Sequence, residues 1–345
     1  MPEISSKSPL IRFGNFVPRG LSNLIAKHSH GVGSSDRMFA EQFNYGHREI
    51  MLQYMGLDFS HQLIGNLQHG TFPPGYEVDY RTPRYLWGRK SKHWVFSKYL
   101  ESDASHKGFS NVIAIGAPWI YIPKSSVLAN SNENIKSNRV LIMPMHSQGD
   151  SINQSTFESK INRAKLFRSA VGDRETTVCL HYFDYLDQDT RKSFESVGFN
   201  VTCLGLGSIP TPWSNATNRL TFLPRLMKLM SEHQYYLTDG FGTSLFYALD
   251  SGMQVSVEMQ IGFELSLGAN GVRTRVDSEL QLKKTVLKYL EINLPNTLGR
   301  YCAANEYVKI SNAWLGKDCF HSPESLRSVI DFRSGVYPDV DERVW

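Results

Sequence analysis

A turn of small polar residues follows a short apolar run in the second half of the chain. The turn is TDGFGTS, residues 238–244, and a helical pattern follows it. Helix N-termini carry unpaired N–H groups and a partial positive charge, so this turn is a candidate phosphate-binding site. The alternative is that its polar side chains only cap the helix. The candidate ligand-binding residues of the turn are Asp239, Gly240, Gly242, Thr243 and Ser244.

Three histidines stand at the ends of three other apolar runs. His69 ends the run in NLQHG, and His181 ends the run in VCLHYFD. In PMHSQGD the run ends at His146, with Ser147 next to it. Histidine is the usual general base near neutral pH, although a single histidine at such a place is more often structural. Three histidines at equivalent places indicate a cleft that binds an anion and in which a proton is transferred.

Apolar runs alternate with helical patterns along most of the chain. This alternation is typical of a parallel sheet covered by helices on both faces, and such sheets bind ligands at the carboxyl ends of their strands. The stretch 124–139 is polar and rich in Ser and Asn, which favours a linker. Strands are predicted at 63–67, 93–98, 111–122, 140–145, 176–183, 200–207, 235–238 and 255–257, and helices at 39–57, 154–170, 188–197, 218–231 and 245–252.

The composition narrows the class of protein. At 345 residues the chain is long enough for two domains of ordinary size or one large one. Its 41% hydrophobic and 20% charged residues are typical of a soluble globular protein, and a net charge of +4 does not indicate a nucleic-acid-binding surface. The 4 cysteines lack metal-type spacing and fit a reducing cytoplasm. We expect neither a signal peptide nor a transmembrane helix.

The order of these motifs resembles that of the bacterial CDP-glycerol glycerophosphotransferases. It also resembles the wider group of GT-B-like transferases of capsules and surface polysaccharides, which includes the CMP-sugar-dependent sialyl- and Kdo-transferases. The resemblance extends from residue 61 to about residue 260. The matching pieces are Gln68-His69-Gly70, Gly116-Ala117-Pro118, Met143-Pro144-Met145-His146, Leu180-His181 and Thr238-Asp239-Gly240-Phe241-Gly242-Thr243-Ser244.

The resemblance implies a GT-B-like α/β fold, which consists of two Rossmann-like domains with a cleft between them. We expect an N-terminal acceptor-side domain over residues 1–123 and a C-terminal nucleotide-donor domain over 140–321. The last segment, 322–345, is expected to return to the N-terminal domain. The implied enzyme is a glycosyltransferase of bacterial polysaccharide synthesis, such as that of capsule or lipopolysaccharide. It would act in the cytoplasm or at the inner face of the cell membrane.

The resemblance also implies roles for single residues. His69 takes the place of the catalytic base, His181 contacts the donor phosphate, and Thr243 and Ser244 bind that phosphate through their hydroxyls. An inverting transfer needs a base for the acceptor hydroxyl, which a histidine can supply at neutral pH. The helix N-terminus, the hydroxyls and His181 can stabilise the leaving phosphate. No DxD motif stands in this region, so we expect neither a metal nor a cofactor.

This sequence departs from the family pattern at three places. Tyr182 follows His181 where Pro is usual, and Gly240 and Gly242 stand where Tyr and Ser are frequent. The Arg-Asn-Asp that often follows the Gly-x-Pro turn is missing. These departures favour a sugar over glycerol phosphate as the donated group. The alternatives that stay open are a polyol-phosphate transferase with a CDP donor and an epimerase-type protein that binds UDP-sugars.

The expected substrates are a nucleotide sugar, with CMP- and CDP-linked donors as candidates, and a saccharide or lipid-linked acceptor. Glu258 follows a predicted strand, where it either binds ribose hydroxyls or is a solvated loop carboxylate. Arginines among aromatic residues suit a saccharide acceptor, although a solvated loop explains them equally well. The candidate acceptor-binding residues are Arg81, Arg84, Trp87 and Arg89. A lipid-linked acceptor implies peripheral association with the membrane, and no nucleic-acid partner is expected.

Overall fold

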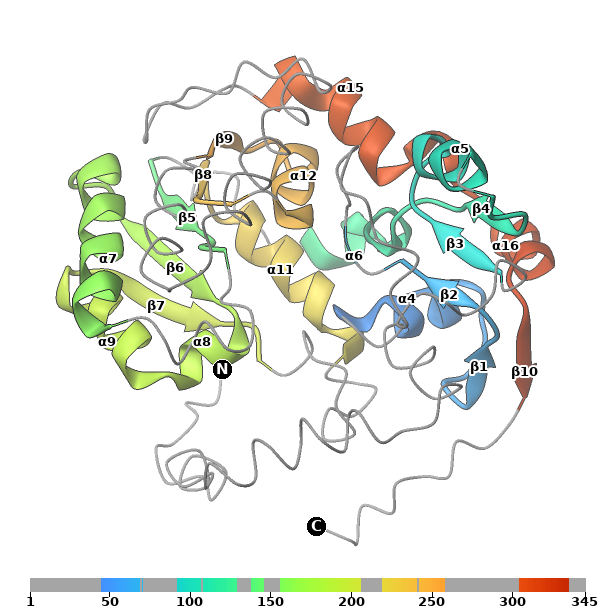
Figure 1. Cartoon of the computed structure of the whole chain (residues 1–345), viewed down its shortest axis with the longest axis horizontal. Helices are drawn as coiled ribbons and strands as arrows, with labels where there is room; N and C mark the ends of the chain where they lie inside the picture. The colour runs from blue at the N-terminus through green and yellow to red at the C-terminus, as the bar shows by residue number, and fades with distance from the viewer. Residues whose placement is uncertain are drawn as a thin grey trace, which may run out of the picture.

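Figure 1 shows the chain, a computed structural model, with two groups of strands and helices lying between them. The structure describes residues 45–68, 70, 92–106, 108–128, 138–145, 156–205, 219–240, 242–257 and 304–334. Over this part of the chain the fold is α/β, and the strands of both larger sheets are parallel. The described strands of the two groups belong to separate sheets. The division of the chain into domains stays a prediction.

The larger sheet has 5 parallel strands in the order β7-β6-β5-β8-β9. Its strands are β5 (Val140–Ile142), β6 (Thr176–Leu180), β7 (Asn200–Cys203), β8 (Tyr235–Thr238) and β9 (Gln254–Val257). Its helices are α7 (Phe157–Val171), α8 (Tyr182–Leu186), α9 (Gln188–Ser196), α11 (Phe222–Ser231) and α12 (Thr243–Asp250). The strands predicted for this region are confirmed, although three of them end earlier than predicted.

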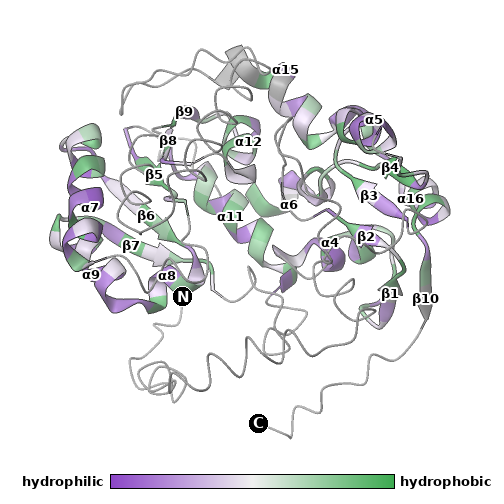
Figure 2. Ribbon diagram, viewed as in Figure 1, coloured by the Kyte–Doolittle hydropathy of each residue, from purple (hydrophilic) through white to green (hydrophobic). Residues whose placement is uncertain are grey.

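Helices cover both faces of this sheet, and the side chains of its strands divide between the two. Val140, Ile142 and Val178 belong to a buried cluster with residues of α7 and α9. Leu141 and Tyr236 belong to the main core, which also contains residues of α11 and α12. Figure 2 agrees: α11 and α12 are largely hydrophobic between the two groups of strands, whereas α7 and α9 carry more hydrophilic residues at the outer side. Burial on both faces explains why these strands read as apolar runs.

The smaller parallel sheet has 3 strands in the order β2-β3-β4. They are β2 (Asn66–Leu67), β3 (His93–Val95) and β4 (Val112–Ala114). The accompanying helices are α4 (His47–Tyr54), α5 (Lys98–His106), the 3-10 helix η2 (Pro118–Tyr121) and α6 (Lys124–Leu128). The predicted strand 111–122 is therefore wrong beyond β4, because Pro118 has no N–H for a strand ladder and starts η2 instead. The predicted linker 124–139 likewise begins as the helix α6.

The C-terminal part of the described chain lies against both groups of strands. It comprises α15 (Ala304–Leu315), the 3-10 helix η6 (Lys317–Cys319), α16 (Pro323–Val329) and β10 (Phe332–Ser334). In α15, Trp314 stacks on Phe246 of α12 with ring centroids 5.3 Å apart. Further on, β10 pairs antiparallel with β1 (His61–Leu63). The segment that ends the described chain thus lies beside a strand from its beginning.

The turn after β4 packs on the turn after α15 with almost no space between the backbones. Gly116 donates its N–H to the Phe96 carbonyl at 3.0 Å, and Ala117 donates to the Leu315 carbonyl at 2.8 Å. Gly316 has a φ of +64°, and a Cβ built on it would lie 1.7 Å from the Phe96 carbonyl oxygen. Only glycine fits this position, so the Gly-x-Pro turn is held by a contact that any side chain would break.

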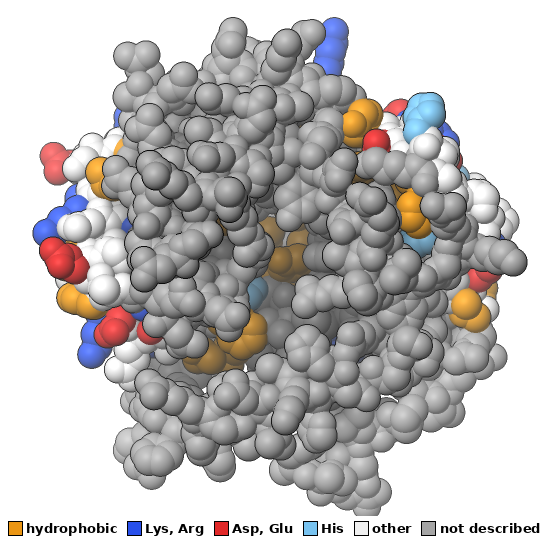
Figure 3. Space-filling view, viewed as in Figure 1, with side chains coloured by type: hydrophobic (Ala, Val, Ile, Leu, Met, Phe, Trp, Pro, Cys, Tyr) orange, Lys and Arg blue, Asp and Glu red, His pale blue; other side chains and the backbone are white. Residues whose placement is uncertain are grey.

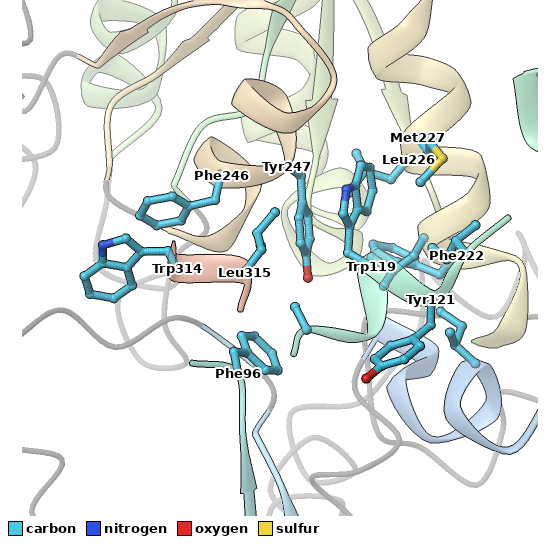
Figure 4. Packing of buried hydrophobic residues seen from close by; sticks show 14 of the residues in the cluster. Phe96, Trp119, Tyr121, Phe222, Leu226, Met227, Phe246, Tyr247, Trp314 and Leu315 are labelled. Atoms are coloured by element: carbon cyan, nitrogen blue, oxygen red, sulfur yellow. The ribbon is translucent and has the colours of Figure 1, made fainter. Parts of the chain in front are cut away.

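A buried carboxylate at the end of α12 joins three other elements. Asp250 accepts a hydrogen bond from Trp119 Nε1 at 2.8 Å and one from Lys124 Nζ at 2.8 Å, and it pairs with Lys317 Nζ. Its side chain is only 1% exposed. One turn earlier, Tyr247 stacks on Trp119 with ring centroids 4.3 Å apart. Figure 4 shows these aromatic rings within the core between the two sheets.

We predict that Gly316→Ala will destabilise the protein far more than Gly252→Ala. Both glycines have positive φ, 64° and 78°, so alanine costs about 1–2 kcal/mol at either place. No atom lies within 4 Å of a Cβ built on Gly252, whereas the clash at Gly316 adds an overpacking cost of about 1–3 kcal/mol. Urea unfolding followed by circular dichroism measures both losses. Equal losses would show that the two backbones are not in contact.

The Asp250 interactions also predict a pH dependence. Burial alone would raise the pKa of Asp250, but the bonds from Lys124, Lys317 and Trp119 outweigh it, and the pKa is lowered. A lowered pKa gives stability that is present above the unfolded pKa, about 3.9, and is lost as the pH falls through the folded value. Asp250→Asn should therefore cost about 1–3 kcal/mol at pH 7. The gap to wild type should begin to narrow at about pH 4 and close only once the pH is below the folded pKa; a gap that stayed constant as the pH fell through this range would contradict the prediction.

Candidate functional site

The turn after β8 is folded around a buried carboxylate. Asp239 is fully buried, and its Oδ1 accepts the backbone N–H of Met145 at 2.7 Å. Its Oδ2 accepts a hydrogen bond from Arg163 Nε at 2.6 Å, and the same guanidinium donates to the Met145 carbonyl at 3.0 Å. Thr238 Oγ1 accepts the N–H of Gly240 at 3.3 Å. The contacts of Asp239 thus hold the turn itself, and its predicted role in ligand binding stays a prediction.

The helix α12 starts directly after this turn and has no side-chain cap. Its N-cap is Gly242, with φ −153° and ψ 175°, and no side chain caps it by a hydrogen bond. The N-cap residue is therefore none of the polar residues that the alternative interpretation names as caps. Thr243 and Ser244 form the first turn of the helix and are half-buried. The hydroxyls of Ser244 and Tyr236 lie 2.7 Å apart, and burial raises the pKa of Tyr236, which keeps its hydroxyl protonated.

The turn after β2 is fixed by one glutamine and one buried histidine. Gln68 donates from Nε2 to the Gly70 carbonyl at 2.5 Å, while its Oε1 accepts the N–H of Phe96 at 2.8 Å. His47 is fully buried in α4, and its Nδ1–H donates to the Gln68 carbonyl at 3.2 Å. These bonds tie α4 and the end of β3 to the end of β2. His69, between Gln68 and Gly70, lies outside the described residues.

The two turns approach each other closely, although they follow strands of different sheets. A Cβ built on Gly70 would lie 3.5 Å from Thr243 Oγ1, which is ordinary van der Waals contact. The carboxyl end of β2 therefore faces the carboxyl end of β8 and the start of α12. Among the described side chains, Figure 3 shows hydrophobic ones and a histidine near the centre of this view of the molecule. Facing strand ends of this kind are where parallel α/β sheets bind ligands.

His181 lies at the same edge of the larger sheet, at the end of β6. It is the N-cap residue of α8, with extended backbone, and is half-buried. Its ring centroid is 5.7 Å from that of Phe183, which is 48% exposed. Met145, at the end of β5, is 42% exposed. In the described part of the larger sheet's carboxyl edge, a histidine thus lies among exposed apolar side chains.

Several predicted site residues lie outside the described residues, so their roles stay predictions. These are His69, His146, Ser147, Glu258, Arg81, Arg84, Trp87 and Arg89. Arg163, Gln68 and His47 were missed, because each acts through a partner that is remote in sequence or through the backbone. Only Gln68 carried a signal, as the residue before the His-Gly pair.

The described residues contain no group of three His, Cys, Asp or Glu side chains arranged to hold a metal ion. The expectation of metal independence stays a prediction. In the same part of the chain, no helix combines the length and apolarity that crossing a membrane requires.

Comparisons with known proteins do not assign this chain to a family. No protein family and no curated protein matches the sequence. One solved structure, a mutant of S. aureus TarM in complex with fondaparinux, alpha-GlcNAc-glycerol and UDP, has 11% sequence identity and a TM-score of 0.37. The match covers 76% of this chain and 49% of that one, so this chain spans about half the length of the matched protein. A similarity of this degree assigns no activity to this chain.

Proposed function

We propose that this protein is a glycosyltransferase that moves a sugar from a nucleotide-sugar donor to an acceptor hydroxyl. The observation that carries the proposal is the close approach of the turn after β2, at Gly70, to the start of α12, at Thr243. A transfer reaction needs two substrates, and a site between two sheets lets each sheet contribute to binding one of them. The GT-B-like arrangement of two Rossmann-like domains is part of this proposal.

The donor phosphate would bind at the start of α12. The first turn of a helix directs N–H groups and a partial positive charge at an anion. Tyr236 stays protonated and can donate to Ser244 Oγ at 2.7 Å, which leaves the Ser244 proton for a phosphate oxygen. Thr243 would contribute a second hydroxyl. Donors placed where charge develops on the leaving phosphate stabilise the transition state.

The acid–base chemistry would fall to the histidines. His69 would accept the proton of the acceptor hydroxyl as that oxygen attacks the anomeric carbon, which gives inversion at this carbon. The bond from the anomeric carbon to the donor phosphate breaks, and the nucleotide leaves with the bonding electrons. His181, at the end of β6, would contact the leaving phosphate. In this proposal no step needs a metal.

The finer features of the proposal concern substrates and place. The donor would be CMP- or CDP-linked, and the acceptor would be a saccharide or a lipid-linked saccharide of a bacterial surface polysaccharide. Such an acceptor would bring the enzyme to the inner face of the cell membrane. A transfer assay separates the alternatives, because a polyol-phosphate transferase would pass on a phosphate group and an epimerase would turn over without acceptor.

The phosphate site predicts that replacing both Thr243 and Ser244 by Ala weakens nucleotide binding. Hydrogen bonds to a charged group contribute about 1.5–3 kcal/mol each, so the loss should exceed tenfold in Kd. Isothermal calorimetry with CMP, CDP and UDP measures it. The matched control is Ser251→Ala at the other end of α12, which should leave the Kd unchanged. Equal affinities of wild type and the double variant would place the phosphate elsewhere.

The histidine roles predict different outcomes for two variants. His69→Ala should lower the transfer rate by about 10²- to 10⁴-fold, the usual share of a general base, while the donor Kd hardly changes. His181→Ala should lose donor affinity and rate together, because a phosphate contact exists in both the ground state and the transition state. Single-turnover transfer and melting temperature are measured for each variant. A His69→Ala protein with near-normal transfer would remove that residue from catalysis.

A further inference from the structure

The order of the larger sheet creates a switch point between β5 and β8. From β5 the chain proceeds to β6 and β7 on one side, and then returns to place β8 and β9 on the other. At such a point the connections after two adjacent strands leave in opposite directions, and a crevice opens at their carboxyl ends. The two turns that border this crevice contain Met145, after β5, and Asp239 with Gly240, after β8.

Arg163 closes these two turns into one unit. It lies in α7, which follows β5 and covers one face of the sheet. Its guanidinium donates from Nε to Asp239 Oδ2 at 2.6 Å and to the Met145 carbonyl at 3.0 Å. Asp239 in turn accepts the Met145 N–H at 2.7 Å. The three residues therefore form a closed ring of hydrogen bonds across the switch point.

The ring is buried and closely packed. The Asp239 side chain is 0% exposed and that of Arg163 is 14% exposed. A buried carboxylate is tolerated only with a paired cation and full hydrogen bonding, and a planar guanidinium can satisfy two acceptors at once. A Cβ built on Gly240 would lie 2.5 Å from Met145 Sδ, so the two turns also touch directly. The charge of Arg163 is thus neutralised by that of Asp239.

We propose that Arg163 is a positioning residue that locks the turns after β5 and β8 together and thereby sets the ligand-binding geometry of Gly240, Thr243 and Ser244. The identity of the ligand as a nucleotide rests on the proposed function, but the coupling of the two turns does not. Asp239 acts in the same unit, which gives this predicted ligand-binding residue a role through the backbone it holds.

The test compares Arg163→Met with Arg168→Met, a matched change in the same helix. Arg168 also uses its guanidinium on backbone carbonyls, those of Val197 at 2.9 Å and Gly198 at 2.6 Å, but these lie at the amino end of β7. Both variants should lose stability. Arg163→Met alone should raise the Kd for CDP and UDP by about tenfold or more, whereas Arg168→Met should stay within about twofold.

Hydrogen exchange and the variant Arg163→Lys provide two further tests of the coupling between the two turns. Hydrogen exchange should quicken at the amides of Met145 and Gly240 in Arg163→Met, and only near the start of β7 in Arg168→Met. Arg163→Lys keeps the charge next to Asp239 but lacks the fork that also reaches Met145, so it should regain stability and only part of the affinity. If Arg163→Met does not fold, Arg163→Lys carries the same test.

The results separate this proposal from the proposed function. Equal nucleotide affinities in Arg163→Met and Arg168→Met would reduce Arg163 to a structural role and overturn the inference. A wild-type protein that binds none of CMP, CDP and UDP would defeat the proposed function instead. In that case the exchange data decide the coupling: faster exchange at both turns supports it, and unchanged exchange overturns it.

Discussion

The position of α12 depends on the buried carboxylate of Asp250 at its C-terminal end. A negative charge there opposes the helix dipole and would be unfavourable without partners. Lys124 and Lys317 supply two cations, and Trp119 supplies a neutral donor. Since these partners belong to α6, η6 and η2, the end of α12 is tied to the side of the molecule that carries the smaller sheet. The other end of the same helix then begins beside Gly70.

The site follows from this arrangement and from charges that are already committed. Arg163 is paired with Asp239, and Glu49 of α4 is paired with Arg48 at 3.1 Å and Arg219 at 2.8 Å. These ion pairs hold the framework. An anion at the start of α12 would be met by backbone N–H groups and hydroxyls. Fixed dipoles of this kind need no reorganisation when a ligand binds, which suits a site that stabilises a leaving phosphate.

The sequence was sufficient for features that depend on local pattern. The apolar runs 140–145 and 235–238 predicted strands because a sheet buried on both faces requires them, and the turn at 238–244 predicted the start of α12. Features that depend on distant partners could not be predicted. Asp239 looked like a ligand-binding residue, and nothing in the pattern of α7 distinguished Arg163 as its partner. Gly316 showed no sign of its contact with Phe96, because 220 or so residues separate them along the chain.

In the proposed function, a nucleotide phosphate binds where the start of α12 faces the turn after β2. A crystal structure of the protein soaked with CDP or UDP tests this most directly. We expect phosphate oxygens within hydrogen-bonding distance of the hydroxyls or amides of Thr243 and Ser244, with Gly70 on the opposite wall. A nucleotide bound elsewhere, or a phosphate held away from the first turn of α12, would contradict it.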